Sequence, residues 1–362
     1  MSVTDVARDE TAWEDFVQAA DPSPYLQRSA WARVKAANGW SATRFLADTP
    51  AGPIGAQILL RRPGPLPWAF AYAPRGPVAP AAGWRPEAIA PFTQGARAAL
   101  GREGRVSHLR IDPEIEADGP LDPEGRLRTA LRDAGWRPAP AIQPASSRLI
   151  DLRADEAALW GDLRKKWRQY VNRARTGGVT VEDAEGDLLP VFYEIYRETA
   201  ARAGFLIRTE RAYRDVWEAY RPQGLARLLI ARLPDGEPAA ALFLVRSGTR
   251  VVEPYGGMTE AGAESRANYL LKWEAIRSSR EAGAETYDLW GLAHPGIAHF
   301  KAGFGGREVR YVGAWDLVLD GLGRTVYGLA QRGRVWLTRR RHGLGAGAAA
   351  APGTGGDAGT EG

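Results

Sequence analysis

The sequence has no cysteine and little histidine. Cys 0 among 362 residues excludes disulfides, thiolate catalysis and every cysteine-based metal site. The histidines are scattered and show no metal-ligand spacing; they are His108, His294, His299 and His342. We therefore expect neither a metal nor a cofactor.

Long apolar runs are also missing. No segment approaches the roughly 20 apolar residues that a membrane span needs, and the opening "MSVTDVARDETAWEDF" has acids where a signal peptide has a basic and then an apolar segment. A chain with 44% hydrophobic and 25% charged residues is typical of a globular protein, and its length suggests about two domains. We expect a cytoplasmic location.

Lysine is scarce although the chain is basic. Of 48 basic residues five are lysines, and the rest are arginines; the lysines are Lys35, Lys165, Lys166, Lys272 and Lys301. In such a background each lysine raises the question whether a compact ammonium is needed in place of a planar guanidinium. The net charge of +5 permits a polyanionic partner.

Short β-like runs and helical segments alternate along the chain, and this cycle occurs twice. The first cycle ends at the Pro/Ala/Ser-rich "AGWRPAPAIQPASS", after which "SRLIDL" starts the second. The pattern predicts an α/β (α+β) protein with domains at 1–147 and 148–320. It also predicts a helix at 321–341 that packs on the first domain, and a disordered tail at 342–362.

The stretch "LWGDLRKKWRQYVNRARTGGVTVE" concentrates positive charge. A helix over 162–176 puts an apolar stripe on one side, and a basic stripe with almost no acids on another. The apolar stripe is Leu163, Trp167, Val171 and Ala174. We interpret the basic residues as a site for phosphate or tRNA, the alternative being a solvated charged face; they are Arg164, Lys165, Arg168 and Arg175.

With "YLLKWEAIR", "AGAETYDLWG" and "HFKAGFGG", this stretch resembles the FemA/FemB/FemX family of peptidoglycan bridge-forming aminoacyltransferases. The resemblance implies two tandem GNAT-like (acetyltransferase-like) domains. It also implies transfer of glycine, alanine or serine from aminoacyl-tRNA to the stem-peptide amine of UDP-MurNAc-pentapeptide or lipid II. Because "ETAARAGFLIRTERAYRDVW" has no insertion, we expect the form without a coiled-coil arm. We expect a monomer with peripheral contact at the inner membrane face.

The resemblance also implies roles for single residues. Lys35 and Arg208 match the clamps for the precursor's diphosphate, a role that suits both cations. Lys301 would stabilise the oxyanion of the attacked ester. Asp112, or the neighbouring His299, is the candidate base. The remaining candidate substrate-binding residues are Tyr213, Tyr255 and Phe300.

Three other functions stay open. An acyl-CoA N-acyltransferase shares the fold, but "RTGGVT" has Thr180 where its pyrophosphate motif needs Gly or Ala. A tRNA-dependent aminoacyltransferase could act on a non-wall acceptor, either an antibiotic intermediate or a lipid. A non-catalytic RNA-binding protein would explain the basic helix but not Lys301 in its Gly-rich loop.

Overall fold

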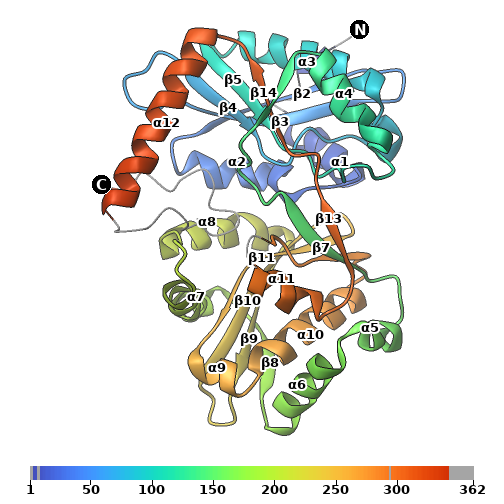
Figure 1. Ribbon diagram of the computed structural model, residues 1–362, viewed down its shortest axis with the longest axis vertical. Helices are drawn as coiled ribbons and strands as arrows, with labels where there is room; N and C mark the ends of the chain where they lie inside the picture. Colours follow the sequence, from blue (N-terminus) through green and yellow to red (C-terminus); the bar gives the residue numbers. More distant parts are fainter. Residues whose placement is uncertain (1–2, 6–8, 293–294, 342–362) are drawn as a thin grey trace. The chain divides into compact units, whose positions relative to one another are not determined.

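The computed structural model describes residues 3–5, 9–292 and 295–341, which form two compact units (Figure 1). The first unit comprises the described residues up to Ala145 together with those from Arg310 onward. The second unit is Ser146–Val309.

The first unit is built on a mixed sheet in the order β1-β2-β3-β4-β5-β14-β6. Its parallel pair is β4 with β5, whereas the other pairs are antiparallel. The strands are β1 Val3–Asp5, β2 Ser41–Ala47, β3 Ile54–Arg61, β4 Ala69–Ala73, β5 Val106–Ile111, β6 Trp136–Ala139 and β14 Ala314–Val318. In Figure 1 the helices lie on both sides of this sheet; they are α1 Glu10–Ala19, α2 Ser29–Ala36, α3 Pro86–Gly101, α4 Arg126–Asp133 and α12 Gly321–Arg341.

Large aromatic side chains fill the core of the first unit. Phe45 on β2 stacks on Phe92 of α3 at a centroid distance of 5.5 Å, and Phe92 stacks on Trp136 at 6.0 Å. The Trp136 indole N–H donates to Thr93 Oγ1 at 2.8 Å, which satisfies the polar atom of this buried ring. The β3 residues Ile54–Leu60 and all residues of β4, the middle strand of the sheet, are buried.

Strand β14 differs from the domain boundary expected at residue 320. Its residues pair with β5 on one side and with β6 on the other, so that they belong to the first sheet and not to the second. Trp315 and Leu317 are buried there, and Asp316 accepts both guanidinium bonds of Arg110 at 2.7 and 2.9 Å. Local periodicity cannot reveal such a return, because both partners of β14 lie far away in the sequence.

The second unit repeats the plan in the order β13-β7-β12-β11-β10-β9-β8, with β11 and β12 as its parallel pair. Its strands are β7 Ser146–Asp151, β8 Thr180–Ala184, β9 Ala226–Arg232, β10 Pro238–Ser247, β11 Arg250–Met258, β12 Thr286–Asp288 and β13 Arg307–Arg310. Its helices are α5 Glu156–Asp162, α6 Lys165–Thr176, α7 Leu189–Ala203, α8 Glu210–Tyr220, α9 Glu260–Glu264, α10 Ala267–Glu281 and α11 Pro295–Ala302. In Figure 1, α7 and α8 lie on one side of the sheet and α6 and α10 on the other.

The connection from α7 to α8 is short. Gly204 ends α7 with a φ of 71°, a left-handed conformation that favours glycine, and residues 204–209 lead directly into α8. This confirms the predicted form without a coiled-coil arm. The predicted α/β (α+β) fold with two units is also confirmed.

The basic segment is helical, as predicted, but it is interrupted. Helix α5 ends at Asp162, and Arg164 has an extended backbone (φ −53°, ψ 141°) before α6 begins at Lys165. The predicted apolar stripe is buried: it consists of Leu163, Trp167, Val171 and Ala174. Gly178, with a φ of +80°, turns the chain into β8.

Helix α12 contacts the first unit through one of its faces. Gly323 lies against Trp68, since a Cβ at this glycine would be 2.6 Å from the indole ring. Arg324 donates to Asp316 at 2.8 Å. The Tyr327 ring stacks on Phe70 at 4.8 Å. The expected tail at 342–362 lies outside the described residues.

Two features are absent from the described residues. No helix among them is both long and apolar enough to cross a membrane. Within the same residues there is no cluster of three or more His, Cys, Asp or Glu side chains that could hold a metal ion.

Candidate active site

The parallel strands of the second unit are paired over a short stretch only. Residues Arg250–Val252 of β11 pair with Thr286–Asp288 of β12. Strand β11 then continues to Met258, whereas β12 ends at Asp288. Beyond Val252 and Asp288 the two strands are no longer paired, and buried polar side chains lie close to this point.

Lys301 on α11 reaches the segment that follows β12. Its ammonium donates to the backbone carbonyls of Trp290 and Gly291, the latter at 2.8 Å. Burial lowers the pKa of Lys301 from 10.5 to about 8; the nearby Lys272 lowers it further, whereas Glu253 and Asp288 oppose the shift. An ammonium with this pKa is still mostly protonated at pH 7, so it can stabilise a developing negative charge.

A buried ion pair lies next to this lysine. Lys272 on α10 donates to one carboxylate oxygen of Glu253, and the Tyr287 hydroxyl donates to the other at 2.8 Å. All three residues are buried. Burial raises the pKa of Tyr287 well above its usual value, and the Glu253 charge adds to the shift. The carboxylate is thus fully paired, which is the condition for burying it at tolerable cost.

Asp288 fixes the turn that presents the carbonyls to Lys301. It accepts bonds from Ser147 Oγ, from the Arg250 guanidinium and, at 2.8 Å, from the backbone N–H of Trp290. Trp290 has a φ of +49°, an uncommon conformation for a non-glycine residue. Strained backbone of this kind often lies at functional sites, because the surrounding structure must hold it.

Aromatic rings connect α11 to α6. The Phe300 ring lies 5.3 Å from Tyr269 and 5.3 Å from Phe304, and its backbone carbonyl accepts the Trp167 indole N–H at 3.1 Å. The Lys272 ammonium lies over the Phe300 ring at 5.7 Å. A Cβ at Gly303 would be 2.2 Å from the Trp167 ring, so that only glycine allows this close packing.

Three of the candidate substrate residues lie together in the second unit. The Tyr213 hydroxyl accepts the backbone N–H of Arg208 at 3.2 Å, and its ring meets Tyr255 edge-on at 5.0 Å. Burial raises the pKa of Tyr255, and the Arg208 guanidinium partly opposes this. Arg208, Tyr213 and Tyr255 therefore form one cluster of a cation and two phenols.

The four basic residues proposed for phosphate binding have different surroundings. Arg164 and Lys165 are exposed, and Arg164 contacts the exposed His299 at 3.2 Å. The Arg168 guanidinium instead donates to backbone carbonyls at the end of α5, including Gly161 at 2.6 Å and Leu163 at 3.0 Å. It is committed to capping that helix.

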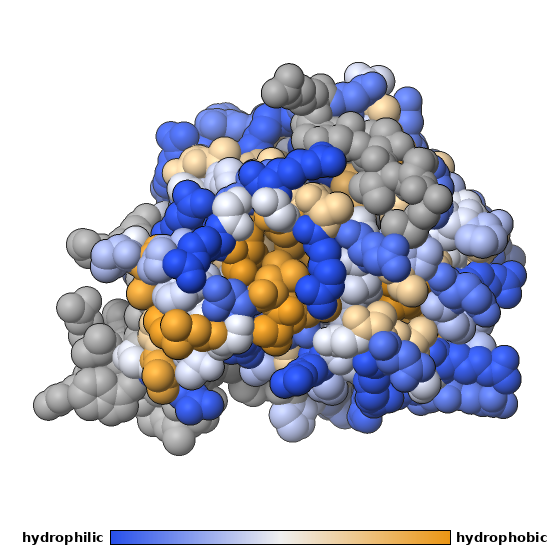
Figure 2. Space-filling view, turned by 90° about the horizontal axis from the view of Figure 1, so that it is seen from above, coloured by the Kyte–Doolittle hydropathy of each residue, from blue (hydrophilic) through white to orange (hydrophobic). Residues whose placement is uncertain are grey.

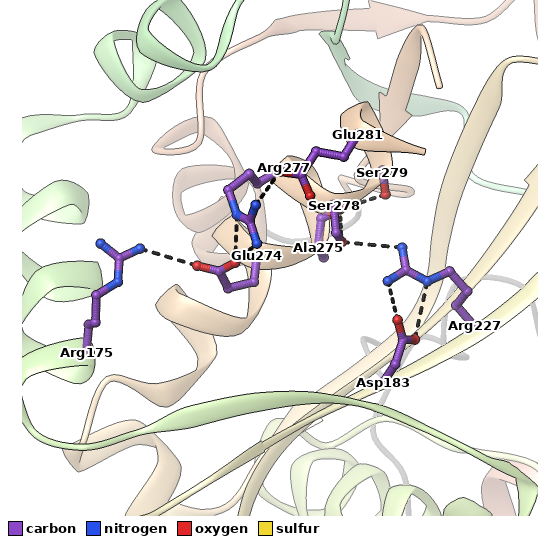
Figure 3. A network of polar contacts seen from close by, with 9 residues as sticks. All are labelled: Arg175, Asp183, Arg227, Glu274, Ala275, Arg277, Ser278, Ser279 and Glu281. Atoms are coloured by element: carbon purple, nitrogen blue, oxygen red, sulfur yellow. Dashed lines mark hydrogen bonds and ion pairs between the residues drawn. The ribbon is translucent and has the colours of Figure 1, made fainter. Parts of the chain in front are cut away.

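Arg175 belongs to a different group. It donates to Glu274 at 3.3 Å beside a pocket of about 300 Å³. Figure 3 shows this pairing and the other ion pairs there, those of Arg277 with Glu274 and Glu281 and that of Arg227 with Asp183. Every cation in this network has an acidic partner, which leaves it no net charge to offer an anion.

The two remaining candidates are in the first unit. Lys35 is buried on α2, with its ammonium 5.0 Å from the centre of the Trp31 ring. Asp112 follows β5 and accepts bonds from the Tyr72 hydroxyl and the Arg75 backbone N–H, both at 2.7 Å, and from the Gln143 N–H at 3.3 Å. Burial raises its pKa, whereas Arg75 and these hydrogen bonds oppose the shift. The geometry is that of a carboxylate that holds a loop.

Sequence reasoning missed Glu253, Lys272 and Asp288 as parts of the site. The rarity of lysine was a usable signal for Lys272. Asp288 gave no signal, because an isolated acid in a β-strand becomes notable only when its burial is known.

The second unit matches a known domain family. Residues 161–302 match the model of the acetyltransferase (GNAT) domain. The two sheets, each with a parallel pair, show the class of fold, two tandem GNAT-like units.

Comparison over the whole chain narrows this class. The chain is 27% identical to the lipid II:glycine glycyltransferase of Staphylococcus saprophyticus, with 88% of this chain and 93% of the relative covered. The structure matches that of FemX with a TM-score of 0.80 at 19% identity, over 91% and 99% of the two chains. A tandem GNAT protein from the clavulanic acid biosynthesis pathway matches with a TM-score of 0.52 at 14% identity, over 88% and 98%. The predicted resemblance to the FemA/FemB/FemX family is confirmed.

Proposed function

We propose that the protein transfers an amino acid from an aminoacyl-tRNA to the stem-peptide amine of a peptidoglycan precursor, thereby forming an interpeptide bridge. The name of the staphylococcal relative makes glycine and lipid II the first pair to test; alanine, serine and UDP-MurNAc-pentapeptide come next. We further propose that it works as a monomer in the cytoplasm.

The observation that carries this proposal is Lys301, held by two backbone carbonyls beyond the end of β12. The acceptor amine attacks the ester carbonyl of the aminoacyl-tRNA, and negative charge collects on the carbonyl oxygen. A lysine ammonium has three N–H groups, so the third can donate to this oxygen. When the intermediate collapses, the new C–N bond remains and the bond to the ribose oxygen breaks. The amine nitrogen loses one proton, and the departing ribose oxygen takes up one proton to become a hydroxyl.

The precursor carries phosphates, and the candidate clamps are cations. We propose that Arg208, supported by Tyr213 and Tyr255, binds one end of the precursor, and that Lys35 binds phosphate on the first unit. Phe300, next to Lys301 in the sequence, would contact the amino acid that is transferred. Asp112 is the base that the resemblance implies, but we propose that it holds a loop instead, because its carboxylate already accepts hydrogen bonds from the Tyr72 hydroxyl and the Arg75 backbone N–H.

A tRNA donor is favoured over acyl-CoA by two features of the second unit. The sequence "RTGGVT" has Thr180 where the pyrophosphate motif of acyl-CoA enzymes needs Gly or Ala. Arg164, just before α6, and Lys165, the first residue of α6, are exposed, and exposed cations suit an RNA backbone.

A mass-spectrometric transfer assay tests the function. The purified protein is mixed with charged total tRNA and with UDP-MurNAc-pentapeptide or lipid II, with and without ribonuclease. We expect a ribonuclease-sensitive mass gain on the stem peptide, which names the amino acid directly. A gain that appears with acetyl-CoA and resists ribonuclease would show that the donor is wrong. No gain on either wall acceptor would move the search to a lipid or an antibiotic intermediate.

A further inference from the structure

Helix α12 carries the exposed large apolar side chains of the described structure. Leu322 is 65% exposed and Leu329 62% exposed, and within the residues described these are the large hydrophobic side chains at the surface. They are seven residues apart, which places them on the same face of a helix. Large exposed apolar groups that share one face are a mark of an interaction site.

The orientation of this face is fixed by the opposite contacts of the helix. Gly323 against Trp68, Arg324 to Asp316, and Tyr327 on Phe70 hold the inner side to the first unit. Asp320, just before α12, accepts the Trp68 indole N–H at 2.8 Å. The two leucines therefore cannot turn inward without breaking this set of contacts.

The charge of α12 has one sign. Its sequence, GLGRTVYGLAQRGRVWLTRRR, contains arginines and no acid. Arg324 is neutralised by Asp316, but Arg332 is exposed. A helix with an apolar face, many arginines and no carboxylate has the composition of helices that lie in the interface of an anionic membrane.

The rest of the surface can be compared with the two exposed leucines of α12. On the face shown in Figure 2, hydrophilic side chains cover most of the periphery, and apolar residues lie in a large central area and in smaller areas beside it. Among the described residues, Leu322 and Leu329 are the large apolar side chains that are exposed, so they are available to an apolar partner.

We propose that α12 docks on the surface of a bilayer that contains anionic lipids, with Leu322 and Leu329 inserted among the headgroups and Arg332 beside them. The charge complementarity selects an anionic membrane over a second copy of this basic chain. The proposal deepens the proposed function, because it places the enzyme at the surface that holds a lipid-linked acceptor. The docking itself does not require the proposed transfer reaction; only its biological role rests on the proposed function.

Vesicle co-sedimentation of the full chain tests the docking, with no acceptor or tRNA present. Vesicles of phosphatidylcholine alone are compared with vesicles that also contain phosphatidylglycerol, at low and high salt. We expect binding to the anionic vesicles only, and weakening with salt because the charges are then screened. Leu329→Glu should reduce binding about tenfold, since it removes an apolar group and adds a repelled charge.

Gln331→Glu is the matched control, because it adds the same charge at another exposed position of α12. It should weaken binding less than threefold by the smaller electrostatic effect alone. Equal effects of the two variants, or no binding by the parent, would overturn the proposal. So would a Leu329→Glu variant that changes only self-association in sedimentation velocity. Transfer to the UDP-linked acceptor should be unchanged in Leu329→Glu, so that failure of docking and failure of the proposed function are separate results.

Discussion

In each unit five consecutive strands, β1–β5 and β8–β12, lie side by side in chain order, but the units differ at the point where the parallel strands end. In the first unit, Asp112 follows β5 and accepts bonds from Tyr72 on β4 and from the backbone of Arg75. These bonds close the space between the strands. In the second unit, β12 is followed by Trp290 and Gly291, whose carbonyls receive the Lys301 ammonium. One fold thus supports either a closed structural link or a cation available for chemistry.

The buried charges differ in the same way. Arg110 and Arg324 both donate to Asp316 in the first unit, an arrangement that holds β5, β14 and α12 together. In the second unit the Glu253–Lys272 pair lies beside a further cation, Lys301, whose pKa it influences. We infer that catalysis belongs to the second unit, and that the first contributes structure and binding.

The largest effect is expected from breaking the buried ion pair. Glu253→Gln leaves the Lys272 ammonium buried without its partner, and loss of one member of such a pair costs about 3–5 kcal/mol in the free energy of unfolding. Denaturant unfolding measures this. The double variant Glu253→Gln/Lys272→Met removes both charges and should recover most of the loss. If the single and double variants are equally unstable, the pair is not a unit.

Lys301→Met should abolish most of the activity without unfolding the protein. Loss of one group that stabilises an oxyanion lowers kcat by roughly 10²–10³. Single-turnover transfer from charged tRNA gives this rate constant. Lys301→Arg is the control that keeps the charge but not the shape, and it should recover part of the rate. Unchanged kcat in Lys301→Met would remove this residue from the mechanism.

The titration of Lys301 should affect the rate constant and the stability of the fold in opposite directions as the pH rises. The ammonium is the active form, so we expect the rate constant to fall as the pH rises through about 8. The folded-state pKa is lower than the unfolded value of 10.5. The unfolded chain therefore binds more protons between about pH 8 and 10.5, and this group makes stability rise with pH in that window. Lys301→Met should lose both trends, which pH series of rate and of unfolding can check.

Variants of Asp112 test whether the first unit also takes part in the chemistry. Asp112→Ala leaves the Tyr72 hydroxyl and two backbone N–H groups without their acceptor, which should cost about 2–3 kcal/mol of stability. Asp112→Asn keeps the shape and an acceptor oxygen, and its transfer rate should stay close to that of the parent. A rate loss of more than about tenfold in a stable Asp112→Asn variant would instead support Asp112 as the base.

The smallest effect is expected from α6. Arg164→Gln with Lys165→Gln should weaken tRNA binding several-fold and reduce the salt dependence by about one or two phosphate contacts. Filter binding at several salt concentrations measures both. Arg197→Gln on α7, where the arginine is exposed and paired with Glu194, is the matched control. An unchanged salt slope would leave the RNA contact to another surface.

The sequence was sufficient for the features that depend on local pattern or on motifs. The buried stripe of α6, the direct α7–α8 connection and the GNAT-like units were all predicted. The surroundings of single charges were not, because they are set by residues distant in sequence. Arg168 looked like a phosphate ligand until its position over the end of α5 was known, and Lys301 is tuned by Glu253 and Lys272 from two other elements.

The return of β14 to the first sheet has a consequence for synthesis on the ribosome. Arg110 and Asp316 are 206 residues apart in the chain, so the N-terminal sheet lacks a strand between β5 and β6 until the second unit has been translated. The second unit can complete its own sheet earlier, which reverses the usual order in which the N-terminal domain folds first. We expect a fragment that ends at residue 313 to be cleaved by protease in the first unit and protected in the second. Protection of the first unit at that length would show that its sheet closes without β14.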